Sequence, residues 1–183
     1  LHTPDIALEQ ARREIVHMAR IAKGGFMDAM AGMLDDDKRK LEAAHVAEDF
    51  TDTLQYEITT YLTELSRREL SESVAVALPV LLHTVNDLER IGDHAVNVVE
   101  IAIRKIEQKL TFTDSALTEI HQLSKEIDEM FDRVIEALDK DDSRAARSAL
   151  PNEQNLNRMQ IDFRRSHVQR LRDGQCTPEA SLI

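Results

Sequence analysis

The residues with the clearest chemical potential are two carboxylates four positions apart, Glu89 and Asp93, within the segment NDLERIGDHAVN at 86–97. On a helix such residues share one face, so the two like charges repel each other by about 0.2–0.5 kcal/mol. The same spacing occurs twice more in the chain, as Glu48 with Asp52 and as Glu153 with Asn157. All three pairs offer only oxygen donors, which are the ligands that hard cations such as Mg²⁺, Ca²⁺, Mn²⁺ or ferric iron take.

The surroundings of these pairs strengthen the case for a metal site, with an ordinary solvated face as the alternative. With about 100° of rotation per residue, five oxygen-bearing side chains fall within an arc of about 80°. These residues are Asn86, Glu89, Asp93, Asn97 and Glu100. The second pair, Glu48 and Asp52, borders the apolar stripe of its own predicted helix. Clustered carboxylates beside a low-dielectric surface are destabilising unless a cation neutralises them.

Two Glu-x-x-His motifs, Glu14 with His17 and Glu42 with His45, suggest a rival chemistry because they fit the ligand pattern of di-iron helical bundles. Ligands in such bundles project into the core, whereas both motifs here lie away from the apolar arcs of their helices. A di-iron oxidase therefore stays an alternative. Since the sequence has no glycine-rich phosphate loop and no nucleophile constellation, we expect a protein that is not an enzyme.

The composition of the 183-residue chain indicates a helical protein. Only 4% of the residues are aromatic, and there are five Gly and four Pro. A net charge of −11 argues against nucleic acid or an anionic membrane as a partner. The single cysteine, Cys176, cannot form an internal disulfide, which favours a reducing, cytoplasmic compartment. No apolar run reaches the roughly 20 residues of a membrane span.

Apolar periodicity predicts five long helices. They cover about 4–34, 38–66, 71–110, 115–140 and 144–172. We expect Gly24 and Gly25 to weaken the first helix and Pro79 to kink the third. Gly92 lies on the apolar side of the third helix, so it should let a neighbouring helix approach closely. A Thr-Pro-acid start signal predicts a sixth helix from about Pro178, of which the chain contains only the first residues.

The order of these elements repeats after about 105 residues. The segment LDDDKRKLEAAHVAEDFTD at 34–52 aligns with LDKDDSRAARSALPNEQNLN at 138–157 with one inserted residue. The sequence therefore predicts an all-α fold of tandem three-helix bundles with up-and-down helices. The first repeat occupies 1–110, and the second occupies 111–183 and lacks most of its third helix. Because apolar surface on the second repeat is left unpaired, we expect a homo-oligomer.

At DLERIGDHAVN, residues 87–97, the sequence resembles the PhoU family of phosphate-uptake regulators. The resemblance spans the chain and is specific at 86–100. It implies binding of multinuclear metal clusters, iron or zinc among them, at surface carboxylates. On this resemblance, the residues matched to the family's metal motifs are Glu89, Asp93, Glu48 and Asp52, with Asp87 in the same motif. In the second repeat, Asn157 stands where a carboxylate would be expected.

The segments TPDIALEQARREIVHMA and CTPEA look most like one branch of that family. In that branch the PhoU-like unit is the cytoplasmic C-terminal domain of a bacterial sodium/phosphate cotransporter. The resemblance then implies a location at the inner face of the cytoplasmic membrane. The implied partners are the membrane domain of a phosphate transporter or phosphate-signalling proteins. Two alternatives stay open: a free-standing regulator of a phosphate transporter and its sensor kinase, and a purely structural helical module.

Overall fold

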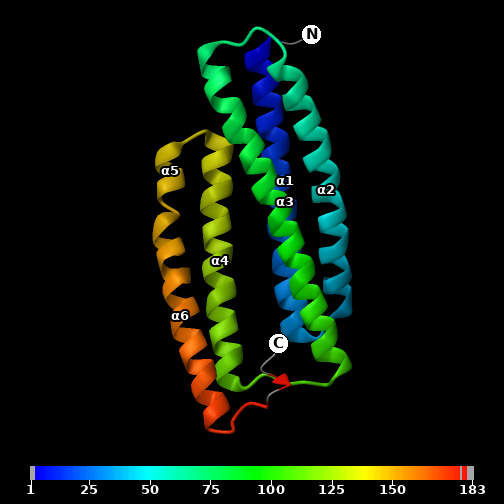
Figure 1. The fold of residues 1–183 in the computed structure, drawn as a ribbon, viewed down its shortest axis with the longest axis vertical. Coiled ribbons are helices and arrows are strands. Elements are labelled where there is room, and N and C mark those ends of the chain that lie inside the picture. Colours follow the sequence, from blue (N-terminus) through cyan, green and yellow to red (C-terminus); the bar gives the residue numbers. More distant parts are fainter. Residues whose placement is uncertain (1–2, 178, 181–183) are drawn as a thin grey trace.

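The computed structural model describes residues 3–177 and 179–180, and in this part of the chain all regular structure is helical (Figure 1). The helices are α1 (Pro4–Asp35), α2 (Lys38–Ser66), α3 (Glu72–Glu107), α4 (Asp114–Lys140), α5 (Ser143–Arg147) and α6 (Leu150–Arg172). The predicted all-α class is confirmed. The sixth helix expected from Pro178 lies largely outside the described residues.

The first four helices start close to the predicted positions, and local capping explains this for α2, α3 and α4. Three start at a residue whose side-chain oxygen accepts a hydrogen bond from a backbone N–H of the first turn. These capping residues are Asp37 for α2, Ser71 for α3 and Thr113 for α4. The third helix continues through Pro79 without a break and ends at Glu107, a few residues before the predicted end.

The prediction of a single helix over 144–172 is wrong, because the structure separates α5 from α6. The physical reason is Pro151. It has no N–H to donate to the carbonyl of Arg147, and in a continuous helix its ring would collide with that carbonyl. The interruption leaves the carbonyl of Ser148 free, and this oxygen accepts a hydrogen bond of 3.0 Å from Arg133 on α4.

The first three helices form a closed bundle in which each helix contacts the other two. Its core consists of two clusters of buried side chains, one around Ile15, Leu62 and Val85 and the other around Ala29 and Val99. The first helix runs unbroken across its two central glycines. No helix in the described part of the chain has the length and apolar character needed to span a bilayer.

The second half of the chain is a helical hairpin that lies beside this bundle (Figure 1). Helix α4 packs against α1, and α5 and α6 fold back onto α4. In the α1–α4 contact the ring centroids of Phe26 and Phe131 lie 6.2 Å apart. Ion pairs between the same two helices include Lys23 with Asp128 at 2.9 Å and Arg12 with Asp141. Helix α4 is therefore fixed to the bundle by both an aromatic contact and ion pairs.

Candidate metal-binding site

Helices α2 and α3 bring two of the predicted carboxylate pairs to the same place. The two helices approach each other closely at Thr51 and Gly92, where a Cβ built on the glycine would be 2.7 Å from Thr51 Oγ1. The expected close approach at Gly92 is thus confirmed. Because Glu48 and Asp52 lie on either side of Thr51 in the sequence, and Glu89 and Asp93 on either side of Gly92, the four carboxylates surround this contact. We call these four residues the carboxylate cluster.

The electrostatics of the carboxylate cluster extend across both helices. Burial and then the charges of Asp52, Asp49 and Asp93 raise the pKa of Glu48 above its ordinary value. Burial and then the charges of Asp93 and Asp52 likewise raise the pKa of Glu89. Each glutamate therefore feels a negative charge from the opposite helix.

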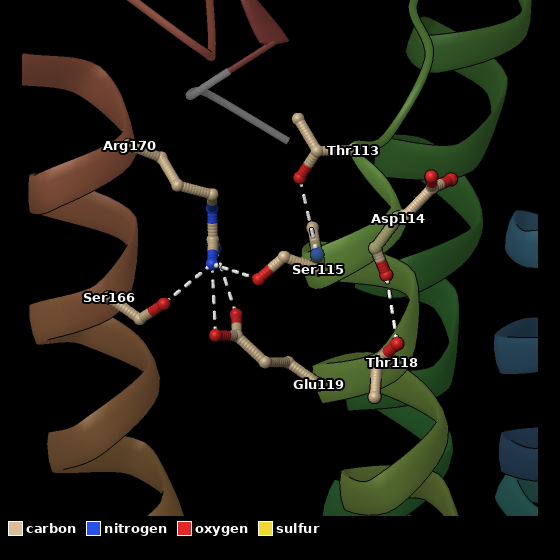
Figure 2. A network of polar contacts seen from close by, with 8 residues as sticks. Thr113, Asp114, Ser115, Thr118, Glu119, Ser166 and Arg170 are labelled. Carbon is tan, nitrogen blue, oxygen red and sulfur yellow. Dashed lines mark hydrogen bonds and ion pairs between the residues drawn. The ribbon is translucent and has the colours of Figure 1, made fainter. Parts of the chain in front are cut away.

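The cluster also lacks the partners that compensate other acidic groups of the protein. Among the described residues, no ion pair or hydrogen bond reaches the side-chain oxygens of Glu48, Asp52, Glu89 or Asp93. By contrast, the partly buried Glu119 on α4 receives two hydrogen bonds from Arg170 on α6, at 2.9 and 2.8 Å (Figure 2). The charge of Arg90 acts on Glu89 in the opposite direction but is outweighed, so the cluster is a site of excess negative charge without a bound partner.

The donor set fits a hard cation in its chemistry, although the side chains are not in ligating positions. All four groups offer carboxylate oxygens from two adjoining helices, as Mg²⁺, Mn²⁺ or ferric iron require. In the described part of the chain, no three His, Cys, Asp or Glu side chains converge closely enough to hold an ion as they stand. A cation would therefore be held only after rotation of these exposed or half-buried side chains.

The remaining predicted ligands lie away from the centre of the cluster. Asp87 is exposed on α3, and its carboxylate lies 4.0 Å from Arg90 Nη1. Glu153 and Asn157 are exposed on α6, which packs on α4 rather than on α2 or α3. The structure therefore does not join this third pair to the other two.

The residues of the di-iron alternative do not converge either. Glu14 and His17 line two different grooves on the outer side of α1 and α2. Glu42 and His45 line another groove, between α2 and the C-terminal part of α3. All four lie outside the bundle core, where di-iron ligands would have to project.

Sequence reasoning did not identify Thr51, the residue of α2 that contacts Gly92 of α3 beside the cluster. Its side chain is completely buried, and its hydroxyl donates a hydrogen bond of 2.8 Å to the carbonyl of Glu48. A signal was present, since Thr51 occupies the position before the second acid of its motif, as Gly92 does in the other motif. A single sequence does not reveal that these two positions face each other.

The fold and the site define an all-α bundle protein with a carboxylate cluster across two helices. The profile of the PhoU domain matches residues 15–102 and 120–183. Because these segments cover most of the chain, the protein belongs to the PhoU domain family, whose members are regulatory helical domains. Comparison with curated proteins and with solved structures returns no match.

Proposed function

We propose that this chain is a regulatory domain that controls phosphate uptake by binding metal ions, with iron or zinc as the expected ions. The observation that carries the proposal is the carboxylate cluster, in which two Glu-x-x-x-Asp motifs meet across α2 and α3 and their negative charges outweigh the nearby charge of Arg90. Membership of the PhoU domain family supports a role in phosphate homeostasis.

The four carboxylates would hold the cation from both sides of the α2–α3 contact. Glu48 and Glu89 are the half-buried members, and Asp52 and Asp93 are the exposed ones. A bound cation would offset part of the negative charge of the cluster and would offer a phosphate oxygen a coordination position. The protein's own contribution is to keep four negative groups close together at the cost of their mutual repulsion.

In the finer form of the proposal, the chain is the cytosolic part of a sodium/phosphate cotransporter and contacts the transporter's membrane domain. The alternative is a free-standing negative regulator that contacts a phosphate transporter and its sensor kinase. The genomic sequence upstream of Leu1 separates the two. Apolar membrane spans in the same reading frame support the fused version, and a start codon directly before this domain contradicts it.

Elemental analysis of protein purified without chelator tests metal binding. We expect iron or zinc in the wild type and a loss of most of it in Glu89→Ala/Asp93→Ala. His17→Ala/His45→Ala serves as the matched comparison, because the di-iron alternative predicts metal loss in that variant instead. Equal and negligible metal in all three proteins would support a purely structural module and would overturn the proposed site.

A further inference from the structure

Two glycines, one on α1 and one on α3, pack closely against α2 beside the carboxylate cluster. A Cβ at Gly92 of α3 would lie 2.7 Å from Thr51 Oγ1 and 3.5 Å from Glu48 Cγ. A Cβ at Gly25 of α1 would lie 2.7 Å from the Cβ of Ala47. Since real Cβ atoms do not approach other atoms this closely, both glycines permit a helix separation that no other residue would allow. The two contacts lie one turn apart on α2.

Thr51 cannot easily yield to a larger neighbour. Its side chain is 0% exposed, so every rotamer must fit within packed surroundings. Rotation would also break the hydrogen bond from Oγ1 to the carbonyl of Glu48 and leave a buried hydroxyl without a partner. A side chain at position 92 would therefore move α3 relative to α2.

We propose that Gly92 and Thr51 are positioning residues that set the separation between the two carboxylate pairs, and through it the size of the cation that can be shared. In each motif the contact residue directly precedes the second acid, as Thr51 precedes Asp52 and Gly92 precedes Asp93. A shift at the contact is therefore transmitted directly to the carboxylates. The claim about the cation rests on the proposed metal-binding function, whereas the claim about helix separation does not.

The separation between α2 and α3 is important because a metal ion accepts only a narrow range of ligand distances. Ligand distances in metal sites are fixed to within about 0.2 Å, and supporting residues hold the site to within about 0.5 Å. Moving a Cβ from 2.7 Å to an ordinary van der Waals contact of 3.4–4 Å exceeds both tolerances. Gly92→Ala should consequently widen the cluster even though it leaves all four carboxylates in place.

Isothermal titration with Zn²⁺ alone tests the proposal on four proteins: wild type, Gly92→Ala, Gly92→Ala/Thr51→Ala and Gly24→Ala. We expect Gly92→Ala to weaken zinc binding by about 10–100-fold, as the loss of a supporting residue does. Thr51→Ala removes the atom that the new methyl group meets, so the double variant should recover most of the affinity. Gly24→Ala is the matched control, because Gly24 is exposed and a Cβ added to it would meet no atom within 4 Å.

Crystal structures of the same proteins give a readout that does not depend on metal. The Cα separation between residues 51 and 92 should increase in Gly92→Ala and return in the double variant. If the wild type binds no zinc, the proposed function fails while this measurement still decides the spacing claim. An unchanged separation together with unchanged affinity in Gly92→Ala overturns the proposal. If Gly92→Ala alone does not fold, recovery of folding by Thr51→Ala supports the contact, and failure to recover overturns it.

Discussion

At the scale of single residues, three partly buried glutamates show two different electrostatic environments. Burial acts to raise the pKa of Glu119, but hydrogen bonds from Arg170 and Ser166 outweigh it, and the pKa falls below its ordinary value. Glu48 and Glu89 experience burial and neighbouring negative charge together, so their pKa values rise. The ionised glutamate stabilises the fold in the first environment and opposes folding in the second.

This difference gives a prediction for the metal-free protein. Because the pKa of Glu89 is raised in the fold, the folded state binds its proton more tightly than the unfolded state does. The contribution of Glu89 to stability is therefore greatest at low pH. It falls as the pH rises from the ordinary pKa of a glutamate through the raised pKa of Glu89 in the fold. Glu89→Gln should remove this fall and raise the free energy of unfolding at pH 7 by about 0.5 kcal/mol. Urea titrations at pH 4 and pH 7 with chelator present measure the effect.

Added metal should reverse the order of stability. A cation that binds only the folded state stabilises the wild type by mass action, and it does so less in a variant lacking one ligand. The same urea titrations with Zn²⁺ should thus find Glu89→Gln less stable than the wild type at pH 7. A variant that stays more stable in both conditions would contradict a role of Glu89 in metal binding.

A second residue-scale prediction concerns Lys105, a lysine that is only 4% exposed. Its Nζ lies 2.5 Å from Asp36 Oδ1 and 5.1 Å from the centre of the Phe112 ring. Asp36 has a φ of 56°, a conformation that asparagine also tolerates. Asp36→Asn should therefore preserve the turn but leave a buried ammonium without its anion, at a cost of about 1–3 kcal/mol.

Thermal or urea unfolding measures that loss. The control is Asp139→Asn, since Asp139 pairs with Arg20 at 3.4 Å and both side chains are more than half exposed. Surface pairs of this kind contribute little, so the control should change stability by no more than about 0.5 kcal/mol. Equal effects of the two substitutions would show that the burial of Lys105 is without consequence for stability.

At the scale of elements, local signals predicted most helix ends, whereas contacts between helices were not predictable. Capping residues such as Ser71 and Thr113 act within one turn, so their effect is readable from the sequence. The interruption at Pro151 was readable too, because a proline inside a predicted helix ends or kinks it. The sequence predicted a close approach at Gly92, because periodicity places this glycine on the apolar side of α3. It did not predict Thr51 as the partner, because that depends on how α2 packs.

The hairpin of α4 and α6 gives a third prediction. Arg170, which is 7% exposed, donates to Ser115, Glu119 and Ser166 and so connects the two helices near their ends (Figure 2). Arg170→Ala would leave Glu119 partly buried without its cation, and breaking such a pair costs about 3–5 kcal/mol when burial is complete. Hydrogen exchange should accelerate throughout α6 and the N-terminal half of α4, with α1 to α3 little affected.

The control and the pH dependence of the same measurement sharpen this prediction. Arg165→Ala removes only an exposed pair with Asp162 and should leave exchange unchanged. Because the pKa of Glu119 is lowered in the fold, ionised Glu119 contributes to stability at a pH above the ordinary pKa of a glutamate. This contribution is lost as the pH falls through the lowered pKa of Glu119 in the fold. Protection of α6 should accordingly decline below about pH 4.3 in the wild type. A uniform decline in all helices would contradict a local role.

At the scale of the whole molecule, the two halves of the chain meet through α1 and α4. Phe26 contacts Phe131 and Lys23 pairs with Asp128, and the members of each pair are 105 residues apart, close to the displacement of the predicted repeat. On that prediction, α1 packs against its own repeat counterpart, as in an isologous dimer interface. The sequence predicted the repeat, but it did not indicate that α1 and α4 would pack against each other.

The last prediction concerns the apolar surface that this arrangement leaves open. A groove of about 340 Å³ lies between α3 and α4 and is lined almost entirely by apolar side chains. Its walls include Leu88, Ile91, Ile127, Met130 and Val134. Contiguous apolar surface of this kind is usually covered by association, so we expect this chain to form a homo-oligomer at micromolar concentration.

Light scattering coupled to size exclusion measures this association. Met130→Glu should be monomeric, because it places a charge in the apolar groove. The control Lys125→Gln changes the net charge by the same amount at an exposed position of the same helix, and it should stay oligomeric. A monomeric wild type would contradict the expectation, whereas an oligomeric Met130→Glu would place the interface on another face.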